Sequence, residues 1–180
     1  MARGGTAVST DDVGADFLRS ARARLASLKG LGDRALERLD EADMGKSLDP
    51  ESNSVAVLVQ HLAGNMRSRW TDFLTSDGEK PDRNRDGEFE PVAGITRAQL
   101  LHRWEDGWRC LFAAVEALTP DDLARTVLIR GEEHTVVDAI NRQLVHYGQH
   151  VGQLVFLAKH FKWQTWQSLS MPRRRPPSAG

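Results

Sequence analysis

The sequence contains a single cysteine, Cys110, and therefore cannot form an internal disulfide. A lone cysteine in an apolar stretch is typical of a buried thiol in a reducing compartment, which favours a cytoplasmic protein. Lys and Arg together number 24 and Asp and Glu 25, so the formal net charge is only -1. Because no charge is in excess, we expect no nucleic-acid partner and no binding to an anionic membrane surface.

Long hydrophobic runs are also missing. No apolar stretch approaches the roughly 20 residues of a membrane span, and the N-terminus lacks the apolar centre of a signal peptide. A chain of 180 residues is long enough to bury a core of its own. We therefore expect one domain, residues 11–172, between a glycine-rich disordered tail at 1–10 and a basic disordered tail at 173–180.

What the sequence does contain is helical periodicity. Apolar residues recur at intervals of three and four in four segments, at about residues 12–39, 55–74, 97–118 and 136–159. The run Ser52-Asn53-Ser54 offers an N-cap for the second, Thr96 opens a capping box for the third and Thr135 caps the fourth. Gly30 and Gly32 suggest a kink in the first. The extended piece at 127–131 is too short for a sheet. The pattern predicts an all-α protein, a four-helix bundle with a long loop between its second and third helices.

That loop, at about residues 75–91, is rich in glycine, proline and charges of both signs. Loops of this length in compact domains are commonly functional or disordered, so two interpretations stay open, a lid over a site and a solvated loop. Four acidic residues in or near it are candidates for a general acid or base, and no catalytic residue is assigned among them. They are Asp72, Asp77, Glu88 and Glu90.

Two histidines in the last helix, His146 and His150, are four residues apart. On a helix this spacing places both imidazoles on one face about 6 Å apart, within reach of one metal ion. Gln143 and Gln153 continue the same inward stripe, and burying such groups without partners costs about 1–3 kcal/mol each. A cation or a ligand-filled cleft would satisfy them. The common alternative is a pair of core histidines with protein partners.

A third histidine strengthens the metal interpretation. His61 replaces a core residue on the inward stripe of the second helix, and Asn65 follows one turn later. A helical bundle can bring His61 together with His146 and His150. Three neutral imidazoles leave a divalent ion its full charge and an open coordination position, which is the arrangement of a catalytic site. Zinc or nickel suits this set best, and iron, manganese or cobalt remains open.

These motifs carry a family resemblance. The segment Gln60-His61-Leu62, the segment Gly131-Glu132-Glu133-His134-Thr135 before the last helix, and His146-x-x-x-His150 followed by Gly152-Gln153 resemble the DinB-like (damage-inducible, YfiT-like) superfamily of metal-binding four-helix bundles. The stretches 69–80, 129–132 and 166–172 are similar to one branch of it, catalogued as a domain of unknown function. The resemblance extends from the first helix to Pro172.

The resemblance implies a homodimer with a divalent metal on His61, His146 and His150. It also implies relatives that transfer low-molecular-weight thiols such as bacillithiol, mycothiol or glutathione, or that use mycothiol in an isomerisation. We therefore expect a metal-dependent transferase acting with a small-molecule thiol on an electrophilic substrate, or a metal-activated hydrolase. The alternatives are a non-catalytic metal-binding protein of the stress response and a dimeric interaction module without metal. No substrate motif decides between them.

Overall fold

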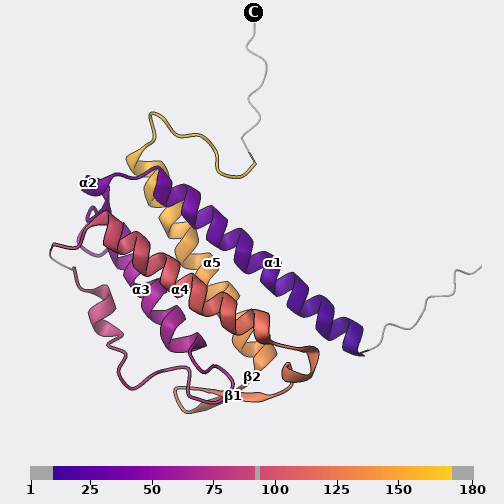
Figure 1. Cartoon of the computed structure of the whole chain (residues 1–180). Helices are drawn as coiled ribbons and strands as arrows, with labels where there is room; N and C mark the ends of the chain where they lie inside the picture. The colour runs from indigo at the N-terminus through magenta and orange to yellow at the C-terminus, as the bar shows by residue number, and fades with distance from the viewer. Residues whose placement is uncertain (1–9, 92–93, 172–180) are drawn as a thin grey trace, which may run out of the picture.

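A computed structural model describes residues 10–91 and 94–171 of the chain. The predicted tails lie outside these residues, except for Thr10, at which the first helix begins. The described chain is mainly helical, with a small antiparallel sheet (Figure 1). Its α-helices and strands are α1 (Thr10–Glu37), α2 (Glu41–Met44), α3 (Val55–Trp70), α4 (Arg97–Ala117), β1 (Thr126–Ile129), β2 (Glu132–Thr135) and α5 (Val136–Phe161), and two short 3-10 helices span Asp86–Phe89 and Pro120–Asp122.

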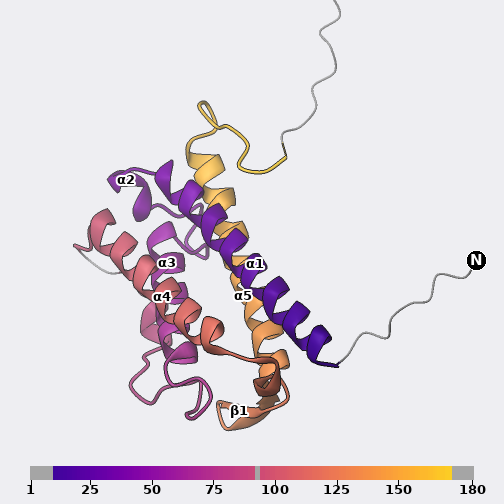
Figure 2. The same cartoon turned by 45° about the vertical axis from the view of Figure 1, so that its right-hand side comes forward.

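The four long helices lie side by side around one core. α1 packs mainly against α5, and α3 packs mainly against α4 (Figures 1 and 2). Trp104 and Trp108 of α4 and Tyr147 of α5 are fully buried in this core. Among the described residues, no helix combines the length and the apolar character that crossing a membrane would require.

The helix starts follow the predicted caps. The Ser54 hydroxyl accepts a hydrogen bond from the Val57 N–H, and Thr96 forms a reciprocal capping box with Gln99. Thr135 caps α5 in the same way through the Asp138 N–H. Each cap satisfies an N–H group that has no partner within its helix, which fixes where these three helices begin.

The predicted kink in the first helix is wrong. α1 runs without interruption through Gly30 and Gly32. A Cβ atom added at Gly32 would lie 2.5 Å from the Trp104 ring. Gly32 is therefore best explained by the close approach of a tryptophan on α4, and tertiary packing outweighs the low helix propensity of glycine.

The structure also corrects the expectation that residues 127–131 are too short for a sheet. β1 and β2 form an antiparallel hairpin, in which Thr126 pairs with Thr135 and Ile129 with Glu132. Arg130 and Gly131 at the turn have φ angles of 58° and 75°, values that suit a tight two-residue hairpin turn. Arg-Gly is not the usual sequence for such a turn, which explains why the pattern gave no hairpin signal.

Candidate metal centre

The structure brings the three predicted histidines together. His61 projects from α3, and His146 and His150 project from successive turns of α5. The ring centroids are 5.2 Å apart for His61 and His146, 4.9 Å for His61 and His150, and 4.7 Å for His146 and His150. One nitrogen of each ring lies within 4.8 Å of the others. Metal binding itself stays a prediction.

Hydrogen bonds to Nδ1 fix the tautomers of two of these rings. The Nδ1 atom of His61 is 2.9 Å from Glu88 Oε2, and that of His150 is 2.9 Å from Gln153 Oε1. Carboxylate and amide oxygens only accept hydrogen bonds, so each Nδ1 carries the proton. In the neutral ring each Nε2 consequently carries a lone pair and no proton, which is the form that binds a metal.

The third ring, His146, faces the other two. Its Nε2 lies 3.1 Å from the Nε2 of His61, and among the described residues its buried Nδ1 has no hydrogen-bond partner. Burial, assisted by the nearby imidazoles of His150 and His61, lowers the pKa of His146 to about 3. Ligand nitrogens about 2.0–2.1 Å from a tetrahedral zinc ion are about 3.3 Å apart, which the pair His61 and His146 approaches, while all three rings offer a nitrogen within 4.8 Å of the others. The three histidines could therefore hold a divalent cation.

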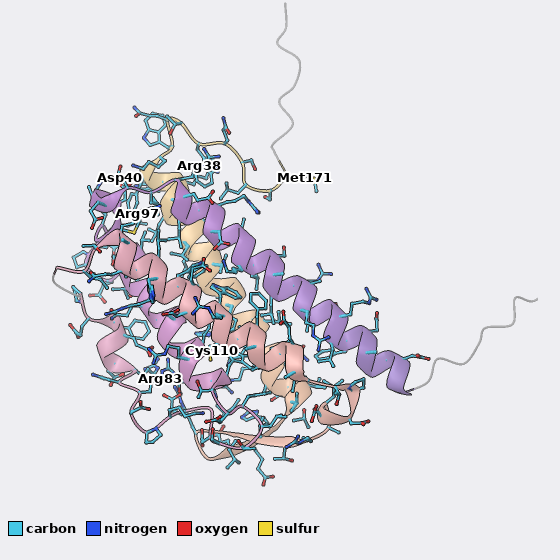
Figure 3. All side chains as sticks on the ribbon, viewed as in Figure 1. Arg38, Asp40, Arg83, Arg97, Cys110 and Met171 are labelled. Atoms are coloured by element: carbon cyan, nitrogen blue, oxygen red, sulfur yellow. The ribbon has the colours of Figure 1, made fainter. Side chains whose placement is uncertain are left out.

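Glu88, which orients His61, is itself held by an arginine. Arg83, labelled in Figure 3 on the segment between α3 and α4, is that arginine. It donates from Nη2 to Glu88 Oε2 at 2.7 Å and from Nε to Oε1 at 2.8 Å. Burial raises the pKa of Glu88, but the hydrogen bonds from Arg83 and His61 outweigh it and lower the pKa below its usual value. Glu88 therefore remains ionised and acts on His61 in the carboxylate–histidine arrangement of many metal sites.

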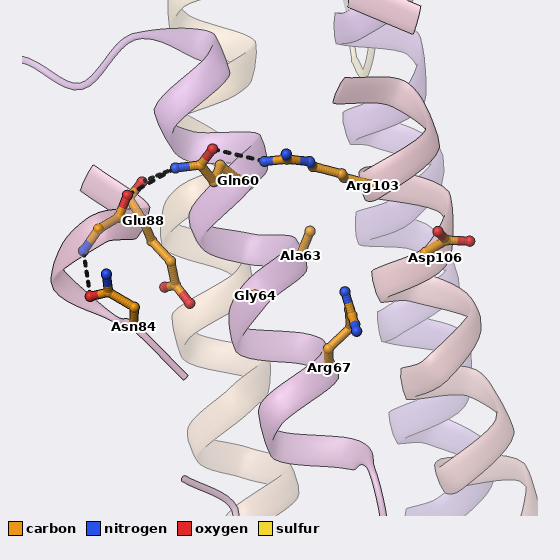
Figure 4. A pocket seen from close by; sticks show the side chains of 9 residues that line it. Gln60, Ala63, Gly64, Arg67, Asn84, Glu88, Arg103 and Asp106 are labelled. Atoms are coloured by element: carbon orange, nitrogen blue, oxygen red, sulfur yellow. Dashed lines mark hydrogen bonds between the residues drawn. The ribbon is translucent and has the colours of Figure 1, made fainter. Parts of the chain in front are cut away.

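Glycine allows this carboxylate to reach the histidine. A Cβ atom on Gly64, one turn after Gln60 on α3, would lie 2.2 Å from Glu88 Oε1. The Gln60 side chain donates to the carbonyl oxygens of Gly87 and Glu88, at 3.1 Å each, and accepts from Arg103 at 3.0 Å (Figure 4). The backbone at Gly87 and Glu88 is thus attached to Gln60 of α3, and the Glu88 carboxylate passes Gly64 one turn further along the same helix.

The loop before Glu88 is anchored to the hairpin and to α3. Asp77 accepts hydrogen bonds from the backbone N–H groups of Arg130 at 2.9 Å and Gly131 at 2.7 Å. Ser68 of α3 accepts from the Lys80 N–H at 2.9 Å and donates to the Gly78 carbonyl at 3.1 Å. A short 3-10 helix, Asp86–Phe89, then carries Glu88 to the site.

The four acidic candidates of the sequence analysis therefore have different positions. Glu88 contacts a predicted ligand, His61, and supports it from behind. Asp77 supports the loop and the hairpin instead, and Asp72 and Glu90 are exposed. Among the amides predicted near the site, Gln153 contacts His150, whereas Asn65 accepts a hydrogen bond from the buried Tyr147 hydroxyl at 3.0 Å.

A cavity of about 320 Å³ opens over the three histidines. Phe89 covers one side of His61, with ring centroids 4.6 Å apart. Sequence reasoning missed the arginines in the cavity wall, because each looks like an ordinary surface charge, even Arg142, which precedes His146 by one turn of α5. They are Arg69, Arg83, Arg85, Arg130 and Arg142.

A second cavity, of about 450 Å³, lies on the other side of Glu88, between α3, α4 and the loop (Figure 4). Its wall includes Gln60, Arg67, Arg103 and Asp106, and none of the three histidines lines it. The chemistry of the metal centre therefore belongs to the smaller cavity.

The chain belongs to the family described as "Protein of unknown function (DUF1572)", whose model matches residues 12–175. That range includes all three histidines, Glu88 and the five arginines. No curated protein matches the chain.

Proposed function

We propose that this member of a family of unknown function is a divalent-metal enzyme that transfers a low-molecular-weight thiol to an electrophilic substrate. We include in the proposal that the four long helices form a four-helix bundle of the DinB-like type and that the protein is a homodimer. The observation that carries the proposal is the meeting of three imidazoles from two helices, two of them fixed as Nε2 lone-pair donors by Glu88 and Gln153.

His61, His146 and His150 would hold the metal, with zinc or nickel as the first candidates and iron, manganese or cobalt as the others. A divalent cation at this position supplies Lewis acidity and lowers the pKa of a thiol or water that it binds. The imidazoles are neutral ligands and leave the charge of the cation intact, while three protein ligands leave room for a substrate atom. Activation of water instead of a thiol would make the protein a hydrolase with the same site.

The chain's own residues position the substrate and protect the site. Glu88 and Gln153 hold the rings of His61 and His150 in one orientation through their Nδ1 atoms. Phe89 excludes water from one face of His61. The loop that carries Glu88 and Phe89 closes one side of the cavity, which supports the interpretation of this loop as a cover over the site.

The deciding experiment is elemental analysis by plasma mass spectrometry of protein purified without a histidine tag. We expect about one divalent ion per chain in the wild type, its loss in His150→Ala, and its retention in His160→Ala. His160 is a matched control because it is an exposed histidine on the same helix. Absence of metal from the wild type after incubation with zinc, nickel, manganese and iron would favour the metal-free interaction module.

Turnover separates the remaining alternatives. Protein loaded with the identified metal should transfer bacillithiol, mycothiol or glutathione to an electrophile, or hydrolyse an ester or amide, and His146→Ala should abolish either activity. A metal-loaded protein that is inactive with all of these would favour the non-catalytic metal-binding protein. Light scattering tests the homodimer independently of both assays.

A further inference from the structure

The cavity over the three histidines is strongly basic. Its lining contains five arginines and, within the described residues, no aspartate or glutamate. The histidines beside them do not balance this charge, because neutral imidazoles are acceptors or weak donors. Positive charge in a concave, partly buried space is stabilised by an anion. The need for a bound anion depends on how many of the five arginines already have carboxylate partners in the protein.

Two of the five arginines have close carboxylate partners. Arg83 is bound by Glu88 on two atoms and by Glu79 at 3.0 Å. Arg85 pairs with Asp86 at 3.3 Å and lies over the Phe89 ring at 5.4 Å. Their charges are therefore used within the loop.

The other three arginines are poorly neutralised. Glu79 Oε2, already bound to Arg83, is 3.5 Å from Arg130 Nε and 4.0 Å from Arg69 Nη2. In the described chain, Arg142 makes no ion pair or hydrogen bond through its side chain, and it is exposed. One carboxylate is thus shared among three guanidinium groups, and a fourth group has none.

Arg69 is the most informative of them because it is almost completely buried, with 3% of its surface exposed. Its Nε and Nη1 atoms have no hydrogen-bond partner among the described residues. Burial lowers the pKa of Arg69, and the like charges of Arg142 and Arg83 act in the same direction, against the opposing influence of Tyr147 and Glu79. A buried, under-compensated cation in a cavity wall is expensive to fold and is characteristic of a site that an anion completes.

We propose that this cavity binds a small molecule bearing a carboxylate or phosphate, with the oxyanion held by Arg142 and Arg130 at the mouth and by the buried charge of Arg69 behind them. A cavity of about 320 Å³ suits one small ligand rather than a polymer. The buried Gln143 Oε1, also in the wall and without a partner among the described residues, is available for an N–H or O–H of the same ligand.

The identification of this ligand as the substrate rests on the proposed function. The thiol or its acceptor would carry the oxyanion, and its reactive atom would lie over the three histidines that share the cavity. The three arginines then distinguish an anionic substrate from a neutral one of the same size, because the neutral molecule leaves their charges unpaired.

Calorimetric titration of chelator-treated, metal-free protein with inorganic phosphate and with succinate tests the site. We expect saturable binding of at least one anion, no binding of neutral succinamide, and weakening of about tenfold in Arg142→Gln. Arg67→Gln is the matched control and should bind as the wild type does. It removes the same charge from an exposed position on α3, two residues from Arg69, but Arg67 lines the second cavity.

Either order of affinity for phosphate and succinate supports the site and identifies the preferred group. Absence of saturable binding, or equal weakening in Arg67→Gln, would overturn it. His150→Ala separates this proposal from the metal proposal, because it should lose metal but keep the anion. Anion binding by a protein that never binds metal would refute the metal-enzyme proposal and support the oxyanion site. Metal binding without anion binding would refute the oxyanion site and leave the metal proposal standing.

Discussion

At the scale of single residues, Gly64 determines whether the Glu88 carboxylate can reach His61. Gly64→Ala places a methyl group where Glu88 Oε1 now lies, so the carboxylate must leave His61. Loss of such a supporting contact commonly lowers metal affinity about 10- to 100-fold, and we expect this here in competition titrations with a chromophoric chelator. Gly148→Ala is the control, since a Cβ there meets nothing within 4 Å although it lies between two of the histidines. Equal affinities in the two variants would contradict the role of Glu88.

Arg69 and Arg83 are both cavity-wall arginines, but they differ in how well the protein neutralises their charge. Arg83 has well-formed carboxylate partners, whereas Arg69 has only a distant one. We expect Arg83→Met to lower the melting temperature, because it leaves the buried Glu88 without its main partner. Arg69→Met should raise the melting temperature in a buffer without oxyanions and should weaken phosphate or succinate binding. A loss of stability in Arg69→Met would mean that its charge is already compensated.

The residues of the site were predictable only where their spacing carried information. His146 and His150 are one helical turn apart, and His61 interrupts an otherwise apolar stripe, so periodicity identified all three. Glu88 and Arg69 have no such signal. One is among eight charged residues between positions 79 and 90, and the other looks like any arginine near the end of a helix. Their roles depend on tertiary contacts that a single sequence does not encode locally.

At the scale of elements, the loop after α3 and the β-hairpin form one unit through Asp77. Burial raises the pKa of Asp77, but the N–H groups of Glu79, Gly131 and Arg130 outweigh it and hold the pKa below its usual value. Asp77→Asn should therefore speed amide hydrogen exchange at Arg130 and Gly131 by about tenfold. Asp82→Asn, an exposed change in the same loop, should leave exchange there unaltered.

The Asp77 contacts also give a pH dependence with a definite sign. A carboxylate with a lowered folded pKa contributes stability in full above its unfolded pKa of about 3.9 and loses it as the pH falls through the folded value. The melting temperatures of wild type and Asp77→Asn should therefore differ at pH 7 and converge on acidification. A difference that persisted at pH 2 would show that the charge of Asp77 is not the cause.

The elements themselves were predicted with uneven success. Thr96, Thr135 and the run 52–54, whose last residue is the cap, identified three helix starts correctly because capping is a local interaction. The uninterrupted course of α1 was missed, since Gly32 is explained by Trp104 on another helix. The hairpin was missed because its turn uses Arg130 in a left-handed conformation, which the Asp77 carboxylate stabilises from 53 residues away.

At the scale of the whole molecule, the histidines join two helices that are distant in the sequence, with His61 and His146 85 residues apart. A metal that binds only the folded chain stabilises it by about 2.7 kcal/mol at a hundredfold excess over Kd. For a protein of this size we expect the melting temperature to rise by about 5–10 °C with the metal. The rise should disappear in His61→Ala and in the presence of a chelator. An equal rise in His61→Ala would place the metal elsewhere.

Glu88 reaches His61 from the loop between α3 and α4. Binding of the metal ion and docking of the loop are therefore thermodynamically coupled. If docking of the loop increases the affinity for the ion by some factor, binding of the ion increases the equilibrium constant for loop docking by the same factor. Cleavage by a protease between Lys80 and Arg85 should therefore be slower when the ion is bound, although none of the proposed ligands lies in that segment. The rate of cleavage should also rise in variants that release Glu88 from His61, so that susceptibility of the loop to proteolysis measures whether the metal site is occupied.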